Sequence, residues 1–340
     1  MTIKARILAA AALCLALPPA AVAGAPPHYA VVDRLHGADG GWDYASVDAA
    51  RARLYVARTD AVMEVDLKTG KVVDRLASAR RAHAVLPIPG TGLLLETDGN
   101  SGLARFVSGD TGAVLAELAT GRKPDAAFFD PATGLVGVMN GDDGTVSLLD
   151  PTTRTLVGAI TVGGALEAGA PDGKGLAYVN VEDKGMIAVI DLRARTLLRS
   201  IAMPGCEEPS GIALVADGTR LISACANGKA MVVDPVAGTV VATLAIGRGP
   251  DAVIADPARG LAFIPSGGTG TLAVIDTRQA KAIRVLASVP TQVGARTGAL
   301  DPTTGRLYLP AATLGAPAPG AKRGAPVPGS FVILVVAPGA

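Results

Sequence analysis

Apolar residues along this chain fall into short runs that end in an acidic residue and lead through a polar turn to a second apolar run. Such runs end at Asp66, Asp150, Asp191, Asp234 and Asp276, and Ser108 takes the same place in a further copy. The successive steps between these six positions are 42, 42, 41, 43 and 42 residues. Short apolar runs bounded by Gly, Pro, Asp and Thr are typical of β-strands. The pattern therefore predicts a repeating unit built from strands.

Two further markers keep the same register. The strand RLYVAR at residues 53–58 has counterparts through the chain, and the seventh copy is RLYLPA at residues 306–311. The stretch GRKPDA at residues 121–126 returns as GRGPDA at residues 247–252. In the unit that starts at Asp125, four strands are expected at residues 126–130, 134–140, 146–149 and 155–162. Four strands in a unit of this length are typical of a β-propeller, and seven copies predict seven blades.

The two ends of the chain predict how the ring closes. The letters VVDRL at residues 31–35 repeat a fourth strand, found again at residues 72–76, but no three strands precede them. The last unit offers three strands, at residues 297–300, 306–310 and 331–336, and no fourth. Residues 29–35 should therefore complete the last blade, which removes two open sheet edges. We expect an all-β fold, with one seven-bladed domain over residues 24–340.

The N-terminus reads as an export signal. Lys4 and Arg6 precede an apolar run at residues 7–17, and Ala-Val-Ala at residues 21–23 offers a cleavage site before Gly24. This predicts a secretory signal peptide at residues 1–23, cleaved between Ala23 and Gly24. The run is too short to span a bilayer, and the bulky Leu13 argues against lipid attachment at Cys14. No later segment is long and apolar enough for a span, so no membrane span is expected.

Composition and charge narrow the partners. The chain is 49% hydrophobic and 18% charged, which excludes disorder. Cleavage would remove two of 31 basic residues and none of 30 acidic ones, leaving a net charge of −1. No nucleic acid is expected from that charge, or from aromatic residues at 3% of the chain. We expect a monomer.

Cys206 and Cys225 remain after cleavage. Cys206 falls in a join between blades and Cys225 ends a second strand, so both should lie on the same face of one blade. In an exported protein this favours a disulfide that fixes the join, and two buried free thiols are the alternative.

Four features carry a family resemblance: the strand LYVA at residues 54–57, the V-I-D strand ends, the G-x-x-P-D joins, and the tail PGSFVILVV at residues 328–336. The chain resembles the YncE-like, or YVTN-repeat, family of seven-bladed propellers of the bacterial periplasm. The resemblance implies the fold and a periplasmic location. It departs from WD40 repeats, since the Gly-His and Trp-Asp pairs are missing. Relatives of this fold include binding proteins, modules of electron-transfer enzymes and lactone hydrolases, so the fold alone selects no chemistry.

In such propellers, the joins from a fourth strand to the next first strand surround one mouth of the central channel. These joins hold a large share of the charged residues of the chain, although loops hold charged residues in most proteins. Arg and Asp of the G-R-x-P-D joins could also simply pair with each other. A charged mouth predicts a small anionic molecule or a periplasmic protein as partner. The candidate ligand-binding residues are Trp42, Tyr44, Arg81, His83, Arg122, Asp125, Glu167, Glu207, Arg248, Asp251 and Arg296. The Pro- and Gly-rich insertion at residues 312–330 should lie over this mouth, as a lid or as an irregular loop.

Catalytic and cofactor motifs are missing. The three histidines are His28, His36 and His83, and no H-E-x-x-H, G-x-S-x-G, Rossmann, P-loop or metal-spaced Cys/His pattern occurs. We therefore expect no catalytic residue, metal or cofactor, and favour a binding or scaffold protein. Two alternatives stay open. One is a lactonase-like hydrolase using His83 with Glu167 or Glu207. The other is an accessory module of a periplasmic redox enzyme.

Overall fold

The computed structural model describes residues 2, 28–317, 319–320 and 324–339. Apart from Thr2, the predicted signal peptide lies outside the described residues and stays a prediction. Across the described part of the chain, no helix has the length and apolarity needed to cross a membrane. The one helical element described there is a short 3-10 turn, Glu182–Lys184.

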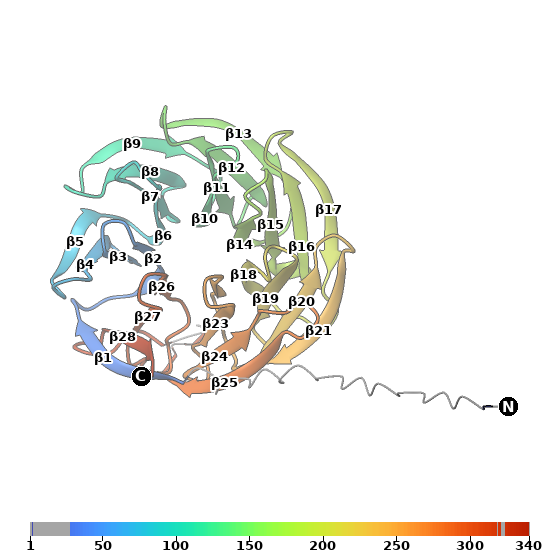
Figure 1. Cartoon of the computed structure of the whole chain (residues 1–340). Helices are drawn as coiled ribbons and strands as arrows, with labels where there is room; N and C mark the ends of the chain where they lie inside the picture. The colour runs from blue at the N-terminus through green and yellow to red at the C-terminus, as the bar shows by residue number, and fades with distance from the viewer. Residues whose placement is uncertain (1, 3–27, 318, 321–323, 340) are drawn as a thin grey trace.

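The described strands form seven four-stranded antiparallel sheets arranged in a ring (Figure 1). Residues of the first strands line a central channel. Blade 1 contains β2 (Trp42–Asp48), β3 (Arg53–Arg58), β4 (Ala61–Asp66) and β5 (Val72–Ser78); blade 2 contains β6 (Ala82–Pro87), β7 (Leu93–Asp98), β8 (Leu103–Ser108) and β9 (Val114–Ala119); blade 3 contains β10 (Pro124–Asp130), β11 (Leu135–Asn140), β12 (Thr145–Asp150) and β13 (Thr155–Thr161). Blade 4 contains β14 (Leu166–Pro171), β15 (Leu176–Val181), β16 (Met186–Asp191) and β17 (Thr196–Ala202); blade 5 contains β18 (Pro209–Val215), β19 (Arg220–Cys225), β20 (Lys229–Asp234) and β21 (Thr239–Ala245); blade 6 contains β22 (Ile254–Asp256), β23 (Leu261–Ser266), β24 (Thr271–Asp276) and β25 (Arg284–Pro290). Blade 7 contains β26 (Ala299–Asp301), β27 (Arg306–Ala311), β28 (Val332–Pro338) and β1 (Tyr29–His36).

The ring closes as the sequence predicted. Strand β1 pairs antiparallel with β28, from Tyr29 opposite Pro338 to His36 opposite Val332. Strand β1 therefore forms the outer strand of blade 7, beside the last strand of the chain (Figure 1). The predicted all-β fold of seven four-stranded blades is confirmed.

The blades are held together by sheet faces that are apolar on both sides. Strand β3 shows the pattern, because successive side chains of a strand point to opposite faces. Leu54 and Val56 pack into a cluster with Phe331 of blade 7, whereas Tyr55 and Ala57 pack into another cluster with blade 2. All four β3 side chains are fully buried. An inner strand therefore needs an apolar residue at every position, which explains why these runs do not alternate with polar residues.

The predicted disulfide is present. Cys206 lies in the join between β17 and β18, Cys225 ends β19, and the two sulfur atoms are bonded with the Cα atoms 5.3 Å apart. The bond ties the join to the second strand of blade 5. A disulfide is compatible with an exported protein.

Replacing both cysteines by serine should lower the free energy of unfolding by about 3 kcal/mol, because the bond closes a short loop in the unfolded chain. Urea unfolding of the wild type and of the Cys206→Ser, Cys225→Ser double variant measures the difference. A reductant should lower the stability of the wild type and leave the double variant unchanged. Equal stability of the two proteins under oxidising conditions would contradict this expectation.

Blade 2 holds a buried ionic network. Arg105 of β8 donates from Nε to Glu96 Oε2 and from Nη2 to Asp98 Oδ2, each at 2.8 Å, and Glu96 is only 1% exposed. Burial raises the pKa of Glu96 to about 7, against the opposing effect of Arg105. The folded protein therefore holds a proton on Glu96 in a pH range where the unfolded chain has lost it.

The free energy of unfolding should consequently fall as pH rises from about 5 to about 8, since over that window the native state binds more protons at Glu96. Glu96→Gln removes this contribution, so the variant should lose less stability over the same range. Urea unfolding of both proteins at the two pH values tests this. Parallel pH profiles would show that Glu96 does not titrate in this window.

Candidate functional site

The first strand of each blade lies innermost in the ring (Figure 1), and its residues line the central channel. The candidate site lies at the start of these strands or just before it. In blades 1 to 5 the pairing between first and second strands shifts at this point, for example between Trp42 and Ala45. Such a bulge adds an unpaired residue and redirects its side chain. The pairing register identifies one equivalent position per blade, occupied in order by Asp43, His83, Asp125, Glu167, Ser210, Asp251 and Arg296. We call these seven residues the channel ring.

The layer beneath the channel ring is made of small residues with one exception. Ala84, Ala126, Ala168, Gly211, Ala252 and Thr297 follow the ring residues of six blades, and Tyr44 follows that of blade 1. The Tyr44 hydroxyl donates a hydrogen bond to the Asp251 carbonyl oxygen of blade 6 at 3.3 Å. Burial, followed by the nearby carboxylates, raises the pKa of Tyr44 well above its ordinary value, so the phenol stays neutral. Below it lies a mainly apolar cavity of about 450 Å³ lined by the first strands.

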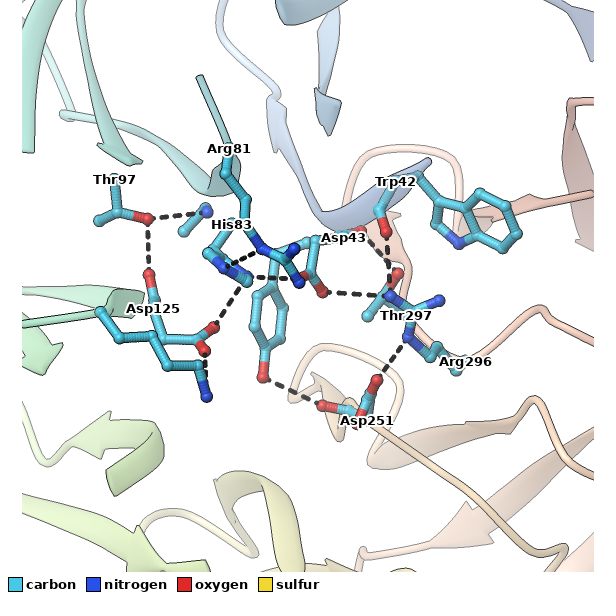
Figure 2. A network of polar contacts seen from close by, with 12 residues as sticks. Trp42, Asp43, Arg81, His83, Thr97, Asp125, Asp251, Arg296 and Thr297 are labelled. Atoms are coloured by element: carbon cyan, nitrogen blue, oxygen red, sulfur yellow. Dashed lines mark hydrogen bonds and ion pairs between the residues drawn. The ribbon is translucent and has the colours of Figure 1, made fainter. Parts of the chain in front are cut away.

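Within the channel ring, charges of opposite sign meet across blade boundaries (Figure 2). Arg296 Nε lies 2.6 Å from Asp251 Oδ2, and Arg296 Nη2 lies 3.6 Å from Asp43 Oδ1. Nη2 also donates to the Trp42 carbonyl oxygen at 2.9 Å. One arginine therefore compensates the carboxylates of blades 6 and 1.

His83 continues the series into blade 2. Its Nδ1 lies 2.7 Å from Asp43 Oδ2, and Arg81 Nε donates to its Nε2 at 3.2 Å (Figure 2). This pattern assigns the ring proton to Nδ1, because Nε2 must accept. Burial lowers the pKa of His83, but Asp43 and Asp125 together outweigh it and the net pKa is raised.

The alternation of charge ends at Asp125 and Glu167, which are neighbouring acids in the channel ring. The Asp125 side chain is 6% exposed, and its nearest basic atoms are His83 Nδ1 at 3.5 Å and Lys123 Nζ at 3.6 Å. Burial raises the pKa of Asp125 to about 6. Burial, and after it the carboxylates of Asp125, Asp251 and Asp43, raise the pKa of Glu167 well above its ordinary range. Glu167 Oε2 is buried, and no described residue donates a hydrogen bond to it.

A cavity of about 200 Å³ adjoins the channel ring at the mouth. It is lined by Gly41, Trp42, Asp43, Thr59, Arg81, Ala82, His83, Arg296, Leu314, Gly324 and Pro326. Three of these come from the insertion at residues 312–330, so the insertion forms one wall, in agreement with its expected position over the mouth. Lys322 and Arg323 lie outside the described residues.

Five of the predicted candidates belong to the channel ring: His83, Asp125, Glu167, Asp251 and Arg296. Trp42, Tyr44 and Arg81 lie beside it. The remaining three lie away from it. Arg122 is exposed and bonded to Asp143, whereas Glu207 and Arg248 line an open cleft of about 1010 Å³ beside the disulfide. Asp43 and Ser210 were missing from the candidates, although their position in the repeat would have identified both.

The pairing within a G-R-x-P-D join, which the sequence left open, is not formed in the first copy. Arg122 pairs with Asp143, from the turn between β11 and β12, and not with Asp125. Asp251 pairs with Arg296 of the next blade. The join turns sharply, with a positive φ of 53° at Lys123, so the arginine and the aspartate face different neighbours.

Asp43, His83 and Asp125 also form the one group of three potential metal ligands found among the described residues, with donor atoms that all lie within 4.8 Å of one another. Ligand spacing along the sequence does not reveal them, because they come from three blades. The sequence had predicted no metal ligand.

No family model matches this chain, and no curated protein matches it. Solved structures do resemble it. The hydrazine synthase of Kuenenia stuttgartiensis has a TM-score of 0.69 at 15% identity, over 79% of this chain and 92% of that one. The structure of U3-55K has a TM-score of 0.73 at 14% identity, over 89% and 98%. A chain of the mitotic checkpoint complex has a TM-score of 0.70 at 14% identity, over 91% and 96%.

The chain is a seven-bladed propeller. At these identities the likeness concerns the fold alone, and the YncE-like family stays a resemblance. The likeness names no ligand and assigns no role to this chain.

Arg296→Met should lower the free energy of unfolding by about 3 kcal/mol at neutral pH, because Asp43 and Asp251 would be left without their shared cation. Urea unfolding of the wild type and the variant at neutral pH measures the loss. Arg284→Met is the control. This arginine is exposed, and its partner Asp276 keeps a second ion pair with Arg278, so the change should cost less than about 1 kcal/mol. Equal losses in the two variants would contradict a role for Arg296 in the channel ring.

Proposed function

We propose that this protein is a periplasmic binding protein of the YncE-like type, which holds a small anionic molecule in the cavity at the channel mouth. The observation that carries the proposal is the exposure and hydrogen bonding of the Arg81 side chain. This side chain is exposed and lines the 200 Å³ cavity. Among the described residues, its guanidinium makes a single hydrogen bond, from Nε to His83. The two Nη groups are left to bind a ligand.

The chemistry of these donors selects an anion. A guanidinium presents its N–H groups in a planar fork that matches a carboxylate or a phosphate. The other charged groups on the cavity wall are already paired, since Asp43 contacts both His83 and Arg296. Among the described residues that line the cavity, Arg81 is therefore the one cation whose donors remain available to an anion.

The size of the cavity limits the ligand. At about 200 Å³ it is smaller than the roughly 300–1,000 Å³ of pockets for drug-sized molecules. It suits a molecule of a few heavy atoms, such as a small carboxylate or inorganic phosphate. The Trp42 side chain and the insertion residues Leu314 and Pro326 supply apolar walls around it.

The hydrolase alternative has one supporting contact, the 2.7 Å hydrogen bond between Asp43 and His83. In a catalytic pair of this kind, the other imidazole nitrogen takes the proton of the nucleophile. Here that nitrogen accepts a hydrogen bond from Arg81 Nε. The hydroxyl of Ser210, the serine of the channel ring, donates to the Pro250 carbonyl oxygen at 2.7 Å. Binding is therefore the better supported function. The protein partner and the redox-accessory module stay predictions.

Isothermal titration with inorganic phosphate, acetate and succinate, in buffer containing EDTA, tests the proposal. At least one anion should bind the wild type, and Arg81→Ala should weaken it by at least about tenfold, as expected for a lost charge-assisted hydrogen bond. Arg80→Ala is the matched control. It removes the same charge from the adjacent exposed residue, which does not line the cavity.

The control variant should bind within about twofold of the wild type, because only long-range attraction changes. Equal weakening by the two variants would show that the effect comes from the loss of a positive charge near the mouth and not from a contact made by Arg81. If none of the anions bound below about 10 mM, an affinity near −3 kcal/mol, the cavity would not be an anion site.

A further inference from the structure

We propose that Asp43, His83 and Asp125 of the channel ring bind a divalent transition-metal ion, with Zn²⁺ as the best match. The site adjoins the anion cavity but does not depend on an anion, so the two proposals can fail separately. Its ligands would be His83 Nδ1, Asp43 Oδ2 and Asp125 Oδ1. These atoms come from blades 1, 2 and 3, so the packing of three adjacent blades sets their positions.

The spacing of the donor atoms is close to that of a filled site. His83 Nδ1 lies 2.7 Å from Asp43 Oδ2 and 3.5 Å from Asp125 Oδ1. Imidazole and carboxylate ligands sit about 2.0–2.2 Å from Zn²⁺, which separates adjacent ligand atoms by about 3–3.5 Å. The donor atoms of all three residues lie within 4.8 Å of one another. A metal ion would therefore need Asp43 to move away from His83 and the two carboxylates to adjust toward the ion.

Asp125 points to a missing ligand. Its carboxylate is 6% exposed and accepts no hydrogen bond from a described residue, because the contacts at 3.5 and 3.6 Å exceed hydrogen-bond length. A buried carboxylate in that state is costly. The next residue of the channel ring, Glu167, adds a buried oxygen without a hydrogen-bond partner among the described residues. This stretch of the ring thus has carboxylates in excess of the contacts that would stabilise them.

The basic neighbours of the site hold the carboxylates without occupying the proposed ligand atoms. Lys123 contacts Asp125 through Oδ2, and Arg296 contacts Asp43 through Oδ1. In each case the other oxygen faces His83 (Figure 2). Metal-binding carboxylates are commonly oriented by such outer contacts.

One imidazole and two carboxylates identify the class of metal. Imidazole favours Zn²⁺ and its transition-metal neighbours, whereas Ca²⁺ and Mg²⁺ prefer oxygen ligands alone. The 200 Å³ cavity reaches both Asp43 and His83 and would give the ion a path of entry and room for water or a ligand. Three protein ligands with a fourth position accessible from a cavity are typical of zinc sites that bind small molecules.

Occupation of the site would also affect Arg81. Nδ1 must release its proton to bind the metal, and the neutral imidazole then holds that proton on Nε2. Nε2 can no longer accept the hydrogen bond that Arg81 Nε donates at 3.2 Å. Metal binding would therefore release the whole Arg81 guanidinium toward the cavity.

The test uses mature protein purified without a histidine tag, treated with EDTA and dialysed. Isothermal titration with Zn²⁺ should give one ion per chain, and Co²⁺ should produce visible absorption bands. His83→Asn and Asp125→Asn should each weaken binding by at least about 100-fold, since loss of even an outer contact costs 10–100-fold. Asp143→Asn is the matched control: the same change on the same face, at an acid that pairs with Arg122 outside the channel ring.

A second measurement needs no variant. The sequence contains three histidines, His28, His36 and His83. Paramagnetic Co²⁺ should broaden the imidazole NMR signals of His83 and leave the other two sharp. Broadening of His28 or His36 alone, absence of Zn²⁺ binding, or equal binding by Asp143→Asn and His83→Asn would overturn the metal site. The anion titration in EDTA would keep its meaning in each case.

Discussion

The structure depends on the closure of its ring. The seven positions of the channel ring face one another because β1 pairs with β28 and joins the two ends of the chain. Buried Arg58 strengthens the junction: it donates to the carbonyl oxygens of Gly41 and Ala38, each at 2.8 Å, and lies 3.6 Å from the centre of the Phe331 ring. Arg58 thus fixes the link between β1 and β2, and with it the start of the strand that carries Asp43. If this junction opened, blades 1 and 7 would separate, and the ion pair between Arg296 and Asp43 would be lost.

Closure of the ring brings charged side chains together in the channel. In an otherwise apolar environment, each of them needs a neighbour of opposite charge. The strands contribute few charges, so most of the electrostatic interactions of the channel come from one residue per blade. From blade 6 to blade 2, each carboxylate has a basic or imidazole neighbour. At blades 3 and 4 two acids follow each other, and Lys123 forms an ion pair with Asp125 at 3.6 Å. The metal site that we propose borders this stretch through Asp125. That is a physical reason to place ligand chemistry there and not in the larger cleft near Glu207, which is open to water.

The fold could be predicted from the sequence because the information is periodic. The spacing of the apolar runs predicted the number of blades. The VVDRL segment, which has no preceding three strands, predicted that the N-terminal strand completes the last blade. The candidate site was predicted in part, since His83, Asp125 and Glu167 fall in the joins that surround the mouth. Their partners could not be predicted by looking within a join. Arg122 bonds to Asp143 in the neighbouring turn, and Asp251 bonds to Arg296 one blade further on. Contacts between blades depend on the angle and distance between sheets, which the repeat pattern does not contain.

The same repeat nevertheless shows where to look for function. Apolar strands can be repeated almost unchanged, because every blade packs against two others of the same kind. The channel ring is different: its seven positions hold carboxylates, an imidazole, a guanidinium and a hydroxyl, although each residue occupies the same place in its blade. Tyr44 breaks the small-residue layer below in the same way, and only in blade 1. Packing alone would favour similar residues at equivalent positions. The ligands that we propose, which would approach blades 1, 2 and 3 most closely, would account for these chemical differences around the ring.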